Sequence, residues 1–149
     1  MGPRRAAREL ALQVLYQMDV QTELSVDQAQ ALVWQSFEAE LELPEANRAE
    51  IEVFALRLVR GTRAEQPRID DLIKTASRNW RPERMARVDR NLLRLGVFEL
   101  MSPQDVPARV AINEAIEIAK RFGTNESPAF INGILDRCLE ELNQAKAPS

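Results

Sequence analysis

The sequence predicts an all-α protein, a single domain of about seven helices, and three observations support this. In nearly every segment the apolar residues recur at spacings of three and four, which is the period of a helix. No segment alternates strictly between apolar and polar residues, as a half-buried strand would. The length of 149 residues is about that of one domain, and it can bury a core without metal or disulfide support.

Two helices are expected at the start of the first half, which spans residues 1–79. The first runs from about Pro3 to about Asp19, because proline is favoured in the first turn of a helix. Ser25 and Gln28 resemble a capping box, which begins the second helix. The apolar stripe of this second helix consists of Ala29, Leu32, Val33 and Phe37.

Two more helices follow the acidic loop around Pro44. Gly61 weakens the end of the third helix, and Pro67 starts the fourth. The predicted apolar stripes are Ile51, Phe54, Ala55, Leu58 and Val59 in the third helix, and Ile69, Leu72, Ile73 and Ala76 in the fourth.

A joint is expected where Trp80 and Arg81 precede Pro82, because the residue before a proline is pushed out of helical geometry. The second half therefore spans residues 80–149. Its fifth helix uses Val88, Leu92, Leu95 and Phe98, and stops before Ser102.

The last two helices are marked by clear start and stop residues. The sixth runs from about Ala108 to Phe122 and ends at Gly123, which we expect to be a left-handed cap. Ser127 followed by Pro128 opens the seventh. Their apolar stripes are Ala111, Ala115, Ile116 and Ala119 in the sixth, and Ile131, Ile134, Leu135, Cys138 and Leu142 in the seventh.

Composition limits the class of protein. Cys138 is the only cysteine and there is no histidine, so an intramolecular disulfide and a Cys-His site are both excluded. A reduced, cytoplasmic protein is expected. No apolar run approaches the roughly 20 residues of a membrane span, so no membrane association is expected.

Charge is distributed unevenly along the chain. The formal net charge of −3 argues against a general polyanion binder. From Asp19 to Glu52 acids greatly outnumber bases, whereas from Arg57 to Arg94 bases outnumber acids about two to one. Such asymmetry allows one face to meet nucleic acid while another meets a protein or water.

Residues that could perform catalysis are few. Asp70 and Asp71 are adjacent, so on a helix they diverge by about 100° and cannot grip one metal ion together. Glu114 and Glu117 share a face, a pattern more typical of solvated carboxylates. The five glycines are scattered singly, without a phosphate-binding loop. The protein is not expected to be an enzyme.

The first helix has an unusual polar side. Arg4, Arg5, Arg8 and Tyr16 fall on one side of it, opposite an apolar stripe. Guanidinium groups beside a flat ring suit phosphates and unpaired bases. A solvated charged face is the alternative, and these residues alone leave both interpretations open.

Phe130 differs from the other aromatic residues, because it points about a quarter turn away from the buried stripe of the seventh helix. Ser127, Asn125 and the unpaired amides of the helix start are expected beside it, a suitable place for a phosphate or a base edge. The alternative, which these residues alone favour, is that Phe130 packs against the preceding loop and over Phe122.

Four motifs occur in series, R-R-A-A-R-E-L-A-L-Q-V-L-Y from Arg4, D-R-N-L-L-R-L-G-V-F-E-L from Asp89, V-A-I-N-E-A-I-E-I-A-K-R-F-G from Val110 and S-P-A-F-I-N-G-I-L-D from Ser127. Together they resemble the NusB family of bacterial transcription antitermination factors over nearly the whole chain. The resemblance implies two small helical bundles packed side by side, without a cofactor or metal.

The resemblance also implies a function. With NusE, which is also a ribosomal small-subunit protein, the family binds the single-stranded boxA element of nascent RNA. That complex joins elongating RNA polymerase with other Nus factors, and it supports transcription and maturation of ribosomal RNA.

Site residues carried over from the family fall in both halves of the chain, and Phe130 is expected to lie near Tyr16. Asp89 is implied as a residue that contacts NusE, and Glu126 as a residue of a modulating loop. The residues implied to bind RNA are Arg4, Arg5, Arg8, Tyr16, Ser127 and Phe130.

Two alternatives stay open. One is a purely protein-binding helical module, such as the NusB-like accessory domain attached to some ribosomal RNA methyltransferases. The other concerns the oligomeric state, monomer or homodimer. A homodimer that uses the arginine-rich surface would hide it until RNA or NusE arrives.

Overall fold

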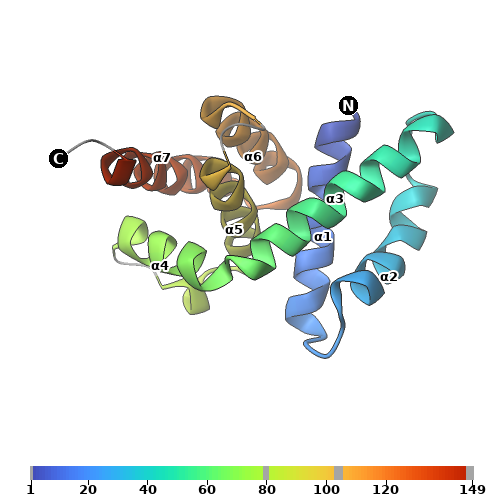
Figure 1. The fold of residues 1–149 in the computed structure, drawn as a ribbon, viewed down its shortest axis with the longest axis horizontal. Coiled ribbons are helices and arrows are strands. Elements are labelled where there is room, and N and C mark those ends of the chain that lie inside the picture. Colours follow the sequence, from blue (N-terminus) through green and yellow to red (C-terminus); the bar gives the residue numbers. More distant parts are fainter. Residues whose placement is uncertain (1, 79–80, 103–105, 147–149) are drawn as a thin grey trace. The chain divides into compact units, whose positions relative to one another are not determined.

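The computed structural model describes residues 2–78, 81–102 and 106–146. Every regular element within these ranges is helical, with seven α-helices and two short 3₁₀ turns, which confirms the predicted all-α fold (Figure 1). The chain divides into two compact units, Met1–Ala64 and Glu65–Ser149.

In the first unit, α1 packs against both α2 and α3. The prediction for α1 is confirmed to within a residue at its end, and Pro3 lies in its first turn. The core comes mainly from small and branched side chains at helical spacing. The elements of the unit are α1 (Pro3–Val20), α2 (Val26–Ala39), η1 (Glu45–Asn47) and α3 (Arg48–Ala64).

The capping box at the start of α2 is confirmed. The amide of Gln28 donates to Ser25 Oγ at 3.2 Å, and the amide of Ser25 donates to Gln28 Oε1 at 2.9 Å. Leu32, however, is exposed rather than part of the buried stripe. Its place on the helix is about 100° from Val33, so it turns away when Val33 and Phe37 face inward.

The third helix extends beyond its predicted end. It passes through Gly61 and ends at Ala64, because Pro67 rather than the glycine interrupts the helical hydrogen bonding. Glu65 precedes α4, and Pro67 lies in the first two positions of that helix.

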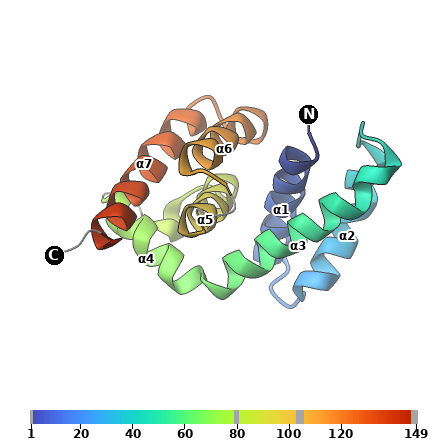
Figure 2. The ribbon, with the colours of Figure 1, turned by 45° about the horizontal axis from the view of Figure 1, so that its top comes forward.

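In the second unit, α5 contacts α4, α6 and α7, which lie around it in Figure 2. Its residues from Asn91 to Val97 are all buried, so α5 is hydrophobic on several sides and forms the centre of this unit. The elements are α4 (Gln66–Ser77), η2 (Pro82–Arg84), α5 (Arg87–Met101), α6 (Ala108–Phe122) and α7 (Ser127–Lys146).

The division by contacts lies between Ala64 and Glu65, earlier than the expected boundary between residues 79 and 80. Helix α4 belongs to the second unit because it packs on α5 and α7. Its buried residues Ile69 and Ile73 provide the packing surface. Trp80, which marked the expected joint, lies outside the described residues.

The prediction of a left-handed cap at Gly123 is wrong. This residue has φ −95° and ψ −165°, an extended conformation that any residue can adopt. A glycine is required for space instead, since an added Cβ would lie 2.5 Å from Ser127 Oγ and 2.9 Å from the carbonyl oxygen of Ala119. The α6–α7 loop therefore passes very close to the first residue of α7.

The predicted stripe of α7 is confirmed, and Cys138 within it is completely buried. Burial, reinforced by the negative charge of Glu141, raises the pKa of Cys138 from 9.0 to about 12. The thiol is thus a core group. Among the described residues, no helix is both long and apolar enough to cross a bilayer.

Candidate nucleic-acid interface

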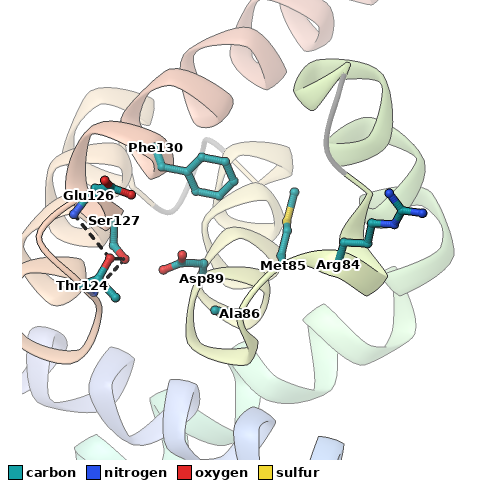
Figure 3. Close-up of a pocket in the computed structure, with 8 residues that line it drawn as sticks. All are labelled: Arg84, Met85, Ala86, Asp89, Thr124, Glu126, Ser127 and Phe130. Carbon is teal, nitrogen blue, oxygen red and sulfur yellow. Dashed lines mark hydrogen bonds between the residues drawn. The ribbon is translucent and has the colours of Figure 1, made fainter.

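A pocket in the second unit brings together four of the predicted site residues, Asp89, Glu126, Ser127 and Phe130 (Figure 3). We call it the Asp89 pocket, and its volume is about 250 Å³. The sequence pattern predicted Ser127 beside Phe130, whereas Asp89 and Glu126 were implied only by the family resemblance. The remaining lining residues are Arg84, Met85, Ala86 and Thr124.

The starts of α5 and α7 build this pocket, together with the end of η2 and the α6–α7 loop. Asp89 lies in the first turn of α5, and its carboxylate points toward Thr124 and Ser127 in Figure 3. Phe130 comes from the first turn of α7, and its ring extends toward the side chain of Met85. The ring is only partly buried. Phe130 therefore offers an aromatic surface at the edge of a pocket that also contains two carboxylates.

The side chain of Ser127 has a structural role in the α6–α7 loop. It is only 1% exposed, and its Oγ accepts a hydrogen bond from the amide of Thr124 at 2.9 Å. The hydroxyl of Thr124 lies 3.3 Å from the same oxygen. The hydroxyl of Ser127 therefore shapes the α6–α7 loop beside Glu126, and an RNA contact of this residue stays a prediction.

The charges of the Asp89 pocket favour positive or neutral hydrogen-bond donors. Asp89 and Glu126 are acceptors when ionised, and the side chain of Arg84 points away from both in Figure 3. Such a pocket suits the amino groups of a base or the basic side chains of a protein partner. Two carboxylates make it a poor place for a phosphate.

A second pocket of about 450 Å³ also borders Phe130, and residues from the end of α4 and from α7 line it. We call it the Arg137 pocket. Sequence analysis did not identify it, although the excess of bases between Arg57 and Arg94 includes Arg78. Its lining residues are Ser77, Arg78, Ala129, Phe130, Gly133, Ile134 and Arg137.

In the first unit, two of the predicted arginines share one aromatic ring. The guanidinium carbon of Arg4 lies 4.6 Å from the centroid of Phe54 on α3, and that of Arg8 lies 5.8 Å away. Arg8 is only 3% exposed, so its expected place on an open arginine face is wrong. Tertiary packing buries this side chain, and Phe54 of α3 contributes to that packing.

Tyr16 and Arg5 lie on a neighbouring stripe of α1. Tyr16 follows Arg5 by eleven positions, so the two lie about 20° apart around the helix and roughly 16 Å apart along it. Tyr16 is 39% exposed, consistent with a ring available to a ligand. These residues belong to the first unit and Phe130 to the second, so the expected proximity of Phe130 to Tyr16 stays a prediction.

The described part of the chain contains no candidate metal-binding site. No group of three or more His, Cys, Asp or Glu side chains there could hold a metal ion. Asp70, one of the acids weighed for such a role, is paired with Arg94.

A model of the NusB family matches residues 5–140. The chain belongs to the NusB family. It is 44% identical to the transcription antitermination protein NusB of Myxococcus xanthus over 97% of this chain and 99% of that one. It is 51% identical to that of Anaeromyxobacter sp. (strain Fw109-5), over 90% of this chain and 87% of that one.

Solved structures agree with this NusB assignment. The NusB structure from T. maritima has a TM-score of 0.80 and 37% identity, covering 95% of this chain and 93% of that one. A crystal structure of the antitermination factors NusB and NusE with dsRNA has a TM-score of 0.78 and 24% identity, covering 95% and 98%. At that identity, the second comparison shows the fold alone.

Membership of the NusB family assigns the chain to transcription antitermination, which is regulation rather than catalysis. This agrees with the sequence-based expectation that the protein is not an enzyme.

Proposed function

We propose that this NusB-family chain binds single-stranded RNA of the boxA type together with NusE, and that the complex supports processive transcription and maturation of ribosomal RNA. The observation that carries the proposal is Phe130, a partly exposed ring at the edge of a pocket that also holds Asp89 and Glu126. Support also comes from a NusB of the same fold that was solved with NusE and dsRNA.

Each unit contributes a different kind of contact to this RNA. Phe130 stacks on an unpaired base, an interaction that contributes about 1–3 kcal/mol per base. Arg4 and Arg5 neutralise phosphates, and Tyr16 adds a second aromatic surface beside Arg5. Arg8 acts indirectly, because it lies with Arg4 over Phe54 and so helps to hold this end of α1 against α3.

NusE occupies the acidic side of the site in this proposal. Asp89 and Glu126 are suited to basic side chains or backbone amides of a protein partner. A partner bound there adds positive surface next to Phe130 and lowers the repulsion between the two carboxylates and the RNA. Binding of NusE and RNA is then mutually favourable, and each raises the affinity for the other by the same factor.

The wider assembly follows from the same role. The RNA-bound pair joins the elongating RNA polymerase with other Nus factors, so contact with the polymerase is indirect. Because nascent bacterial RNA is made in the cytoplasm, we place the protein there.

A titration of labelled boxA RNA tests the proposal. The boxA RNA binds more tightly than a scrambled RNA of equal length and composition, and the difference grows when NusE is present. Equal affinity for the two RNAs with NusE bound would overturn the proposal.

Charge reversal separates RNA binding from a purely protein-binding role. Arg5→Glu is the sharpest variant, because Arg4 and Arg8 also stack on Phe54 and their loss disturbs the fold. The matched control is Arg68→Glu, an equal charge change at an exposed position on α4. RNA cross-linking in the assembled complex falls for Arg5→Glu only. Unchanged cross-linking in both variants would favour the protein-binding module.

A further inference from the structure

Phe130 lines two pockets of opposite charge. The Asp89 pocket contains two carboxylates, and the Arg137 pocket contains two guanidinium groups. We propose that the Arg137 pocket binds a single phosphate of the RNA strand, adjacent to the base that stacks on Phe130. This inference rests on the proposed RNA-binding function.

The lining of the Arg137 pocket matches an anion. Arg78 and Arg137 are its charged groups, and none of the described residues that line it is acidic. Both side chains are exposed to solvent. Guanidinium groups form paired, charge-assisted hydrogen bonds with phosphate oxygens. A volume of about 450 Å³ leaves space for a phosphate and part of its sugar.

Arg137 is held in place by α4. Its Nη1 donates to the carbonyl oxygen of Ala76 at 3.0 Å, a bond that joins α7 to the last turn of α4. The carbonyl groups at a helix C-terminus carry partial negative charge and repel anions. The bond from Arg137 covers one of these carbonyl groups. A guanidinium has five N–H donors, so the remaining donors of Arg137 stay available for a phosphate.

Arg78 supplies the second positive charge, and its backbone has an unusual conformation. It follows α4 with φ 52° and ψ −65°, and it is the only non-glycine residue with positive φ in the described part of the chain. This region of φ favours glycine, and side chains held there are enriched at ligand sites. An arginine at this position therefore favours a role for its side chain.

Gly133 is the independent observation that points to a ligand. It lies inside α7, where glycine is less favourable than alanine. Yet an added Cβ would meet no atom of the described residues within 4 Å, so packing against them does not require a glycine. The open space above it belongs to the Arg137 pocket. Close approach of a bound group to the helix backbone explains the residue.

The spacing along α7 places these features on one face. Gly133, Ile134 and Arg137 follow Phe130 by three, four and seven positions, so all four lie on one stripe of the helix. An RNA strand whose base lies on Phe130 can therefore place its neighbouring phosphate over Gly133, with Arg137 one turn further along.

The salt dependence of RNA binding tests the proposal. The protein with NusE is titrated with labelled boxA RNA at several salt concentrations, comparing Arg78→Gln/Arg137→Gln with a control, Arg68→Gln/Lys74→Gln, that removes equal charge from exposed positions on α4. Loss of one phosphate contact reduces the slope of log K against log salt by about 0.7. An unchanged slope, with boxA selectivity intact, overturns the inference and leaves the proposed function standing.

Gly133→Leu tests the site without removing either arginine. A leucine extends into the open pocket and blocks the phosphate, while leucine is favoured in a helix. We expect weaker RNA binding with an unchanged or raised melting temperature. Wild-type affinity in a folded Gly133→Leu protein contradicts the inference.

Single methylphosphonate substitutions in the boxA RNA identify the phosphate. At one position, the neutral linkage weakens binding to the wild-type protein but has no further effect on Arg78→Gln/Arg137→Gln, because both changes remove the same contact. Additive losses at every position overturn the inference. If the wild-type protein binds boxA RNA no more tightly than a scrambled RNA, that separate result overturns the proposed function itself.

Discussion

Arg94 on α5 donates two hydrogen bonds to the carboxylate of Asp70 on α4, Nε to Oδ1 at 2.8 Å and Nη2 to Oδ2 at 3.0 Å. The side chains are 10% and 29% exposed, so this pair is partly shielded from water. It joins α4 to the central helix of the second unit, and α4 in turn provides Ser77 and Arg78 to the Arg137 pocket.

Asp70→Asn is therefore expected to destabilise the protein by about 1–3 kcal/mol, because Arg94 stays largely buried with a neutral partner. Asp71→Asn is the matched control, since Asp71 is exposed on the same helix, and its effect is within about 0.5 kcal/mol. Urea unfolding of both variants measures the difference. Equal midpoints would show that the pair contributes nothing to stability.

Phe130→Ala is expected to weaken binding of boxA RNA by about 1–3 kcal/mol, because a stacked base loses its aromatic partner. The melting temperature changes little, since the ring is only partly buried. Phe130→Tyr keeps the ring and keeps most of the affinity. Fluorescence anisotropy with NusE present measures binding, and equal affinities for the two variants would exclude stacking.

Substitution by alanine is expected to change the stability of the protein in opposite directions at two glycines near the start of α7. Gly123→Ala is destabilising, because its Cβ would lie 2.5 Å from Ser127 Oγ and 2.9 Å from a backbone carbonyl. Gly133→Ala is neutral or stabilising by up to about 1 kcal/mol, because an added Cβ would meet none of the described residues within 4 Å. Thermal unfolding measures both, and destabilisation of equal size would contradict the packing described for Gly133.

Cys138 is expected to resist alkylation at pH 8 in the folded protein, because burial and Glu141 raise the pKa of its thiol to about 12. Unfolding in urea restores rapid reaction. The same shift stabilises the fold at pH values below about 9, and this contribution is lost as the pH rises from 9.0 to about 12. Cys138→Ser should remove this part of the pH dependence. Fast labelling without denaturant would contradict the burial.

Local sequence patterns predicted the helices well, because helical periodicity and capping act over a few residues. The capping box of Ser25 and Gln28 is an example, since both partners lie within one turn. Predictions failed where a distant segment decides the environment. The start of α1 shows this, because tertiary packing, to which Phe54 of α3 contributes, buries Arg8.

By itself, the sequence determined the all-α class, the order of the helices, the core stripe of α7 and the family motifs. All of these depend on the spacing of residues that are close together in the sequence. Only the tertiary structure decided that Asp89 and Phe130 line one pocket, and that Arg78 and Arg137 line another beside it. The physical reason is that a pocket forms where helix ends from separate parts of the chain meet, and packing of the intervening helices determines which ends meet.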